Sequence, residues 1–321
     1  MDSLTQIALG ASVAAAVGFK PFGRKVLLAG AILGTLPDLD VLISYQTAID
    51  NFTFHRGFSH SLIVLSALSV FLYRLALYFR PQWKAYKKSL FLTILLPLIT
   101  HPLLDAFTSY GTQLWWPIPV QPTSWSSIFI IDPLYTLPLL IAVLGLWLQK
   151  NTLKWYKINS IVLCISCAYL ILGQAQFWYL KQKLTIDPIV KNSQVFISPT
   201  PFNIFVWRII SYQDDTYYET FSSVLNIQNT EWQAFATGRS LTKQFKSTEL
   251  QRLEWFSDGL LSFSERQGRL IVTDLRIGLS LYYPFSFSIA KREQDQNWLV
   301  IPSQKMPEPE VSWEVLMETL Q

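Results

Sequence analysis

The chain has 321 residues, a formal net charge of +4, two cysteines and three histidines. Residues 1–180 hold six aspartates, no glutamate and twelve Lys or Arg, whereas the remainder holds sixteen acidic and fourteen basic residues. The basic residues of the first part lie in short clusters between apolar runs, which is typical of membrane topology signals and not of a nucleic-acid-binding surface. The composition therefore predicts a membrane domain over residues 1–180 and a soluble domain over residues 181–321, with no nucleic-acid partner.

Six apolar segments predict a multi-pass α-helical membrane domain of about six helices. The first segment, Leu4–Val17, is short and rich in alanine, so we expect it to pack as a helix against its neighbours. The other helices are predicted at Val26–Tyr45, Ser61–Phe79, Ser89–Phe107, Ile128–Leu148 and Ile158–Tyr179.

The loops between these helices alternate between basic and nearly uncharged. Because short cytoplasmic loops carry the excess of Lys and Arg, the first, third and fifth loops are predicted to be cytoplasmic. The N-terminus, the even loops and the domain after residue 180 are then predicted to be extracytoplasmic. The basic residues that decide this orientation are Lys20, Arg24, Lys25, Arg80, Lys84, Lys87, Lys88, Lys150, Lys154 and Lys157.

The second part of the chain has the pattern of a mostly β domain. Aromatic and β-branched runs at 203–212 and 216–225, split by Gln213-Asp214-Asp215, predict one hairpin. Runs at 260–265 and 269–277 around Gln267-Gly268 predict a second. A short helix is predicted at 248–256, with Thr248 and Gln251 in capping-box positions. This domain has no histidine and no nucleophile motif, and its position alone favours substrate recognition or shielding of the membrane site.

Three short polar stretches interrupt the apolar part of the chain and contain all three histidines. Imidazole and carboxylate groups are the usual ligands of zinc and similar divalent ions, and ionisable groups inside a membrane are functional candidates. The predicted orientation places these stretches at the same side of the membrane, so they predict a site for one or two divalent ions, with zinc expected. The predicted ligands are Asp38, Asp40, His55, His60, His101 and Asp105.

Each of these residues also has a structural interpretation. His101 and Asp105, four residues apart on one helix face, can form a buried hydrogen bond that joins helices. His55 and His60 can cap a helix or contact lipid headgroups, and the two aspartates behind Pro37 can end a helix. The joint pattern favours a metal site, because carboxylates crowded together outside water need a cation or shared protons to offset their repulsion.

Four further features have two interpretations each. Asp132 is expected beside the ligands or among them. Arg56 can clamp a phosphate or carboxylate, although an ordinary interfacial arginine is the favoured interpretation. The tryptophan-rich segment 110–127 can form a lid or an interfacial belt, and the belt is favoured. Cys164 and Cys167 lie in an apolar run, so packing residues are expected and not a redox or metal pair.

Several stretches of the chain resemble the signature of the bacterial inner-membrane, predicted metal-dependent hydrolases. This family is itself distantly similar to zinc-dependent phospholipase C and P1-type nucleases, in which a His-x-x-x-Asp pair, matched here by His101 and Asp105, binds metal on a helix. Many members carry a histidine where this chain has Gln6, so the resemblance leaves open a ligand from the first segment. The matching stretches are MDSLTQ at 1–6, LPDLD at 36–40, HRGFSHS at 55–61, HPLLD at 101–105, TSYGT at 108–112 and IDP at 131–133, with SPTP at 198–201 and WR at 207–208 resembling the tail of longer members.

Two classes of function follow from these observations. The first is a membrane-embedded metal-dependent hydrolase that acts on a phosphoester or lipid-like substrate at the outer face of the inner membrane. In this hypothesis Asp38, Asp40 and Asp132 are the candidate catalytic residues, and an uncoordinated aspartate transfers the proton. The second is a non-catalytic membrane protein with a structural His/Asp cluster and a C-terminal domain that docks a partner. An open coordination position would distinguish them, because catalytic zinc sites have one and structural sites do not.

Overall fold

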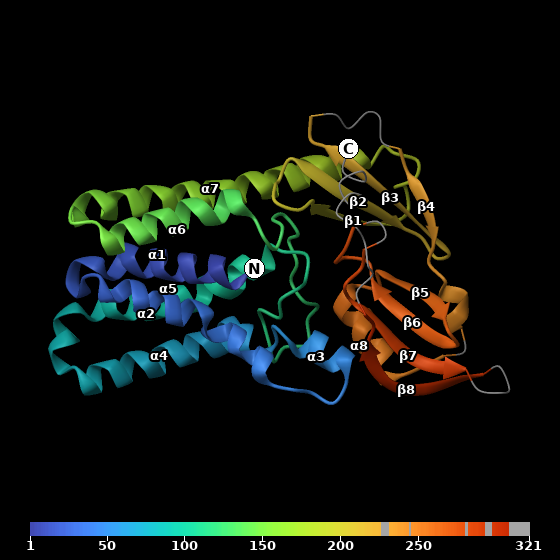
Figure 1. The fold of residues 1–321 in the computed structure, drawn as a ribbon, viewed down its shortest axis with the longest axis horizontal. Coiled ribbons are helices and arrows are strands. Elements are labelled where there is room, and N and C mark those ends of the chain that lie inside the picture. Colours follow the sequence, from blue (N-terminus) through green and yellow to red (C-terminus); the bar gives the residue numbers. More distant parts are fainter. Residues whose placement is uncertain (226–230, 244, 280–281, 293–296, 308–321) are drawn as a thin grey trace. The chain divides into compact units, whose positions relative to one another are not determined.

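The computed structural model describes residues 1–225, 231–243, 245–279, 282–292 and 297–307. The chain forms two compact units (Figure 1). The helical unit contains residues 1–43, 56–175 and 201–203. The β unit contains residues 44–55, 176–200 and 204–321, so a short segment from the middle of the first half, Ser44–His55, belongs with the strands.

The described residues confirm a helical membrane part followed by a domain of antiparallel sheets. Four helical segments are long and apolar enough to cross a membrane, namely Ser3–Phe22, Leu62–Phe79, Pro81–Ala106 and Thr152–Leu184. The apolar helices are α1 (Ser3–Phe22), α2 (Lys25–Thr35), α4 (Leu62–Phe79), α5 (Lys87–Ala106), α6 (Pro133–Leu148) and α7 (Thr152–Leu184), with the 3-10 helices η1 (Leu36–Leu42), η2 (Phe58–His60) and η3 (Pro81–Tyr86) between them.

Several helix boundaries differ from the prediction. The helix expected to reach Tyr45 ends at Thr35, because Pro37 has no N–H to continue the α-helical hydrogen bonds and the chain tightens into η1. Helix α6 begins at Pro133 behind its N-cap Asp132, five residues later than expected. Helix α7 extends beyond the predicted segment at both ends, and its Cys164 and Cys167 are exposed.

Helices α1 and α2 pack with their backbones nearly in contact. A Cβ added at Gly30 would lie 2.3 Å from the carbonyl oxygen of Gly10, and one added at Gly34 would lie 2.8 Å from that of Gln6. Gly30 and Gly34 form a G-x-x-x-G pattern, and small residues at this spacing allow close packing of membrane helices. This packing fixes the end of α2, and therefore the start of η1, against the first turns of α1.

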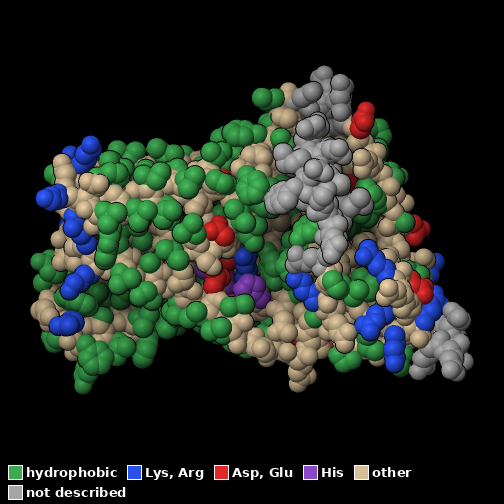
Figure 2. Space-filling model, viewed as in Figure 1, with side chains coloured by type: hydrophobic (Ala, Val, Ile, Leu, Met, Phe, Trp, Pro, Cys, Tyr) green, Lys and Arg blue, Asp and Glu red, His purple; other side chains and the backbone are tan. Residues whose placement is uncertain are grey.

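The helical unit has one basic end. The helices alternate in direction, so the basic residues that follow α1, α4 and α6 gather with those that precede α2, α5 and α7. Figure 2 shows Lys and Arg side chains gathered at this end, with hydrophobic side chains along the length of the helices. The polar stretches around Asp38, His60 and His101 lie toward the opposite ends of the same helices.

The β unit contains two four-stranded antiparallel sheets with consecutive strand order. Both predicted hairpins are confirmed: β2 pairs with β3 and β5 pairs with β6. The second hairpin turns at Gln267 and Gly268, both in the left-handed region with φ of 52° and 68°. The strands are β1 (Gln194–Pro199), β2 (Val206–Tyr212), β3 (Thr216–Ser223), β4 (Gln233–Ala236), β5 (Leu261–Arg266), β6 (Arg269–Asp274), β7 (Ser286–Arg292) and β8 (Trp298–Lys305).

The β unit also contains two short helices, the 3-10 turn η4 (Arg239–Thr242) and the end of α7. Helix α8 (Thr248–Ser257) is capped by Ser247, whose side chain accepts a hydrogen bond from Leu250 N, so the predicted capping box was wrong by one residue. Helix α3 (Ala48–Phe54) was not predicted, because its seven residues were assigned to a loop. It packs by its aromatic side chains, and the ring of Phe52 lies 4.7–5.4 Å from those of Phe256, Phe285 and Phe287.

Candidate metal centre

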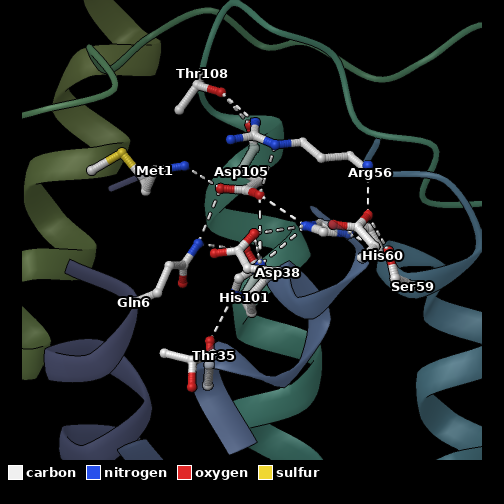
Figure 3. Close-up of polar contacts among 12 residues, drawn as sticks. Met1, Gln6, Thr35, Asp38, Arg56, Ser59, His60, His101, Asp105 and Thr108 are labelled. Atoms are coloured by element: carbon white, nitrogen blue, oxygen red, sulfur yellow. Dashed lines mark hydrogen bonds and ion pairs between the residues drawn. The ribbon is translucent and has the colours of Figure 1, made fainter. Parts of the chain in front are cut away.

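Four ionisable side chains from three elements of the helical unit converge on one point (Figure 3). Asp38 comes from η1, His60 from the end of η2, and His101 and Asp105 from successive turns of α5. One ligand atom of each residue lies within 4.8 Å of the ligand atoms of the other three. The structure therefore joins parts of the chain that are more than sixty residues apart in sequence.

The converging atoms are two imidazole nitrogens and two carboxylate oxygens. His60 Nε2 lies 3.1 Å from His101 Nε2, 3.5 Å from Asp38 Oδ1 and 3.2 Å from Asp105 Oδ2. His101 Nε2 lies 3.3 Å from Asp38 Oδ1 and 3.6 Å from Asp105 Oδ2. Four atoms that accept hydrogen bonds or bind cations thus face one another at close range.

The outer nitrogen of each imidazole ring has a partner that orients the ring. His101 Nδ1 donates to the carbonyl oxygen of Gly34 at 2.6 Å, which turns its Nε2 lone pair toward the cluster. His60 Nδ1 lies 2.9 Å from Ser59 Oγ, and Ser59 Oγ donates to Asp40 Oδ2 at 2.6 Å. We therefore assign the proton of neutral His60 to Nδ1, which leaves Nε2 as an acceptor.

Asp105 is held differently at its two oxygens. Its Oδ1 accepts a hydrogen bond from Gln6 Nε2 at 3.0 Å and another from the nitrogen of Met1. Its Oδ2 is buried, and among the described residues no hydrogen bond reaches it. Arg56 Nε lies 3.1 Å from this oxygen and forms an ion pair with it. The carboxylate therefore keeps its coordinating oxygen toward the two histidines.

Arg56 is buried beside the cluster, which differs from the expected interfacial arginine. Its guanidinium donates to Thr108 Oγ1 at 3.2 Å and lies 4.8 Å from the ring centre of Tyr110. Its backbone has φ of 59°, which is unusual for a residue with a long side chain. The bond from Arg56 N to Asp40 Oδ2, at 3.0 Å, and the bond from Gln113 N to Arg56 O, also at 3.0 Å, hold this conformation.

The pKa values of two groups in the 3-10 helices shift in the directions that favour mutual pairing. Burial raises the pKa of the Asp38 carboxyl, but hydrogen bonding to His101 and His60 outweighs burial and holds that pKa below its ordinary range. Burial lowers the pKa of His60, whereas its interactions with the carboxylates of Asp105 and Asp38 raise it, and the net direction is upward. The cluster therefore attracts positive charge, which either a proton or a cation can supply.

The residues present fit a divalent metal ion. Four ligands about 2.1 Å from a shared tetrahedral ion lie roughly 3.4 Å from one another. The separations from the two Nε2 atoms to their partners are 3.1–3.6 Å. The buried Asp105 Oδ2, without a hydrogen bond in the described part of the chain, is the atom that a cation would satisfy. His60, His101, Asp105 and Asp38 are the residues that would hold the ion.

Three predicted site residues lie outside this group. Asp40 is buried behind His60, where its Oδ2 lies 3.7 Å from Nδ1, the nitrogen that points away from the cluster. Asp132 is fully buried as the N-cap of α6; it accepts hydrogen bonds from Leu134 N at 2.9 Å and from Tyr169 Oη at 2.7 Å. His55 follows α3 and belongs to the β unit.

The structure also identifies supporting residues to which the sequence had assigned no contact. Gln6 touches Asp105, Gly34 orients His101 through its carbonyl, and Ser59 connects His60 with Asp40. Gln6 and Ser59 lie inside the stretches that carried the family resemblance, so those stretches were the available signal. Gly34 had no such signal, because its role depends on a backbone carbonyl.

An apolar helical unit with several candidate spans and a polar cluster toward one end defines an integral membrane protein. The family model described as YdjM inner membrane protein matches residues 1–178. The chain therefore belongs to this family, and its location is the inner membrane.

Two curated proteins show the extent of the similarity. The inner membrane protein YbcI of Escherichia coli (strain K12) is 37% identical over 117 residues, which are 35% of this chain and 64% of that protein. The uncharacterized protein YfhP of Bacillus subtilis (strain 168) is 27% identical over 216 residues, which are 65% of this chain and 64% of that protein. The chain thus spans less than two thirds of the length of either relative. No solved structure matches the chain.

Proposed function

We propose that the protein is a membrane-embedded, metal-dependent hydrolase that acts on a phosphoester or lipid-like substrate at the outer face of the inner membrane. The His/Asp cluster supports the binding of a metal ion, and zinc is the expected ion. The resemblance to zinc-dependent phospholipase C and P1-type nucleases, which rests on the His101 and Asp105 pair, supports hydrolysis. The printed names of the two relatives assign neither hydrolase activity nor a cofactor.

One observation carries the proposal: three of the four candidate metal ligands are fully buried and the fourth is not. The side chains of His60, His101 and Asp105 are 0% exposed, whereas that of Asp38 is 25% exposed. If the partly exposed Asp38 gives up its position to water, His60, His101 and Asp105 remain as three protein ligands, and this is the pattern of catalytic zinc sites, whereas structural sites stay closed. Asp38 therefore marks the side from which water and substrate reach the cluster.

A divalent ion held by these residues would lower the pKa of a water and polarise a phosphoryl oxygen. Asp38, at the accessible side, is placed to accept a proton from the attacking water. The water oxygen bonds to phosphorus, the bond from phosphorus to the leaving alcohol breaks, and the alcohol oxygen takes a proton. The buried guanidinium of Arg56, paired with Asp105, would add positive charge near a bound phosphoryl group.

The orientation of the site rests on the basic end of the helical unit. If the excess of Lys and Arg marks the cytoplasmic side, the cluster faces the outside, and so does the domain after residue 180. His101 is fourteen residues after Lys87, the first residue of α5, which places it roughly 21 Å along that helix from its basic end. Reporter fusions after residue 250 that are active only in the cytoplasm should stay inactive; an active fusion would reverse this orientation.

Metal analysis and turnover of the purified full chain test the proposal together. The wild type should retain about one or two divalent ions per chain and hydrolyse a generic phosphodiester or a phospholipid, and His101→Ala should lose both properties. Asp38→Asn should keep most of the metal and lower kcat far more than it raises KM. A protein that binds metal but turns over neither substrate would favour the non-catalytic alternative, in which Asp38 completes a closed, structural site and the β unit docks a partner.

A further inference from the structure

The accessible side of Asp38 borders a run of exposed apolar side chains on η1. Val41 is 71% exposed and Leu42 is 77% exposed, and Leu39 is also exposed. In a 3-10 helix residues three apart share a face, so Val41 lies on the face of Asp38 while Pro37 and Asp40 form the buried face. The partly exposed carboxylate of the cluster is therefore followed on the same short helix by three exposed aliphatic side chains.

The apolar surface continues from η1 onto the next elements of the helical unit. Helix η1 packs against η2, whose first residue, Phe58, is exposed. The ring of Phe58 lies 6.2 Å from that of the exposed Trp116. Ser61 Oγ donates to Trp116 O at 2.6 Å and fixes this loop beside η2. We call this surface the apolar rim, and it consists of Leu39, Val41, Leu42, Phe58 and Trp116.

The composition of the rim fits contact with lipid. Transfer of apolar surface out of water is favourable, so several exposed aliphatic side chains together favour an apolar environment. Residues 41–49 and 110–131 contain no Lys, Arg, Asp or Glu, and tryptophan is typical of the membrane-water interface. Helix α4, a candidate span, begins directly after η2, so the rim lies where a span would leave the hydrocarbon.

We propose that the apolar rim is embedded in the bilayer and that the substrate is a phospholipid of that bilayer. The phosphoester reaches the cluster past Asp38 while the acyl chains stay against Leu39, Val41 and Leu42. This inference rests on the proposed function for its chemistry, but the lipid contact of the rim stands on the exposed side chains alone. It assigns the rim a role in selecting a membrane amphiphile over a water-soluble phosphoester.

A polarity-sensitive dye tests the lipid contact without any activity measurement. The dye is attached to Leu42→Cys in the full chain carrying Cys164→Ser and Cys167→Ser, reconstituted in phosphatidylglycerol and phosphatidylethanolamine vesicles. Ile171→Cys, exposed on the candidate span α7, is the lipid reference, and Arg266→Cys in the β5–β6 hairpin is the water reference. Emission from Leu42→Cys should be blue-shifted and quenched by nitroxide lipids, as at Ile171→Cys. Emission like that of Arg266→Cys would overturn the proposal.

A pair of substrates tests the selection of lipid. The double variant Val41→Ser with Leu42→Ser should lower kcat/KM for phospholipid in vesicles at least about tenfold and lower that for a short water-soluble phosphodiester far less. Phe79→Ser, an equally exposed apolar residue at the basic end of α4, is the matched control and should change neither. An equal loss of kcat/KM on both substrates, or no loss on phospholipid, would overturn the proposed selection of phospholipid by the rim. If the wild type turns over neither substrate, the proposed function fails together with the substrate assignment. The dye result alone then decides whether the apolar rim contacts lipid.

Discussion

The two units bury ionisable groups in opposite ways. In the β unit the guanidinium of Arg208 is surrounded by acceptors: Glu219 Oε1, the carbonyl of Leu275 at 2.7 Å and the hydroxyl of Tyr283 at 2.8 Å. In the helical unit the Nε2 atoms of His60 and His101 lie 3.1–3.6 Å from one another and from carboxylate oxygens of Asp38 and Asp105.

A buried cation among its acceptors is complete in itself, and its role is structural. A buried set of acceptors that face one another is incomplete, because it needs a proton or a metal ion to offset its repulsion. Burial of charge alone therefore does not identify a functional site in this protein. The balance of hydrogen-bond donors and acceptors identifies a functional site. It separates the cluster at Asp38 from the ion pair at Arg208.

The largest expected effect is the loss of bound metal when a buried candidate ligand is removed. His101→Ala or Asp105→Asn should lower metal affinity by more than the 10- to 100-fold typical of residues that only support a ligand. Metal content by mass spectrometry and affinity by calorimetry on the purified full chain measure this change. A variant that folds normally and keeps the affinity of the wild type would contradict the assignment of these residues as ligands.

The matching change in the β unit should affect stability and not metal. Arg208→Met leaves Glu219 buried without its guanidinium, and breaking a buried ion pair in this way costs about 3–5 kcal/mol. Denaturant unfolding of the full chain should show an earlier transition while metal content stays at the wild-type value. Loss of metal in Arg208→Met at temperatures where the chain remains folded would remove the distinction between the two buried groups.

A smaller effect is expected from Gly34, which connects helix packing with the cluster. In Gly34→Ala the added Cβ would lie 2.8 Å from the carbonyl of Gln6, so α2 must shift and the carbonyl that orients His101 must move. Metal affinity should fall about 10- to 100-fold, and crowding should cost about 1–3 kcal/mol. Ile32→Ala, at an exposed position of the same helix, is the control and should change the metal affinity little.

The outline of the fold and the core of the candidate site could be predicted because their signals are local. Long apolar runs mark helices, alternating aromatic and β-branched residues mark the two hairpins, and the histidines stand alone in an apolar part of the chain. Roles that depend on tertiary contacts could not be predicted. The turn at Arg56 places His60 at the cluster and leaves His55 with the β unit, and a five-residue spacing does not reveal this separation.

Two of the predicted ligands can now be compared directly. Asp40→Ala should lower metal affinity about 10- to 100-fold, because the aspartate accepts bonds from Arg56 N and Ser59 and so orients His60. His55→Ala should leave affinity within about twofold of the wild type, since His55 is not among the four converging residues. Calorimetric titration of both variants ranks them. An effect of His55→Ala as large as that of Asp40→Ala would return His55 to the site.

The smallest expected effect concerns an exposed ion pair of the β unit, which completes the contrast with the buried groups. Both nitrogens Nε and Nη2 of Arg292 donate to the carboxylate of Glu265 at 2.7 Å. This hydrogen bonding lowers the pKa of Glu265 from its ordinary value of 4.5. A carboxyl whose pKa is lower in the folded state stabilises the fold above the ordinary pKa, and this stabilisation is lost as the pH falls through the folded value.

Glu265→Gln should therefore lower the melting temperature slightly at pH 7, and this difference should vanish as the pH falls through the folded-state pKa of Glu265, which lies below 4.5. Because solvent screens the pair, the difference at pH 7 should also shrink in about 1 M salt. Thermal unfolding followed by circular dichroism, at pH 7 and at lower pH and with and without added salt, measures the difference in melting temperature. A large loss at pH 7 that salt does not reduce would place this pair with the buried ones, and exposure would then no longer separate weak pairs from strong ones in the β unit.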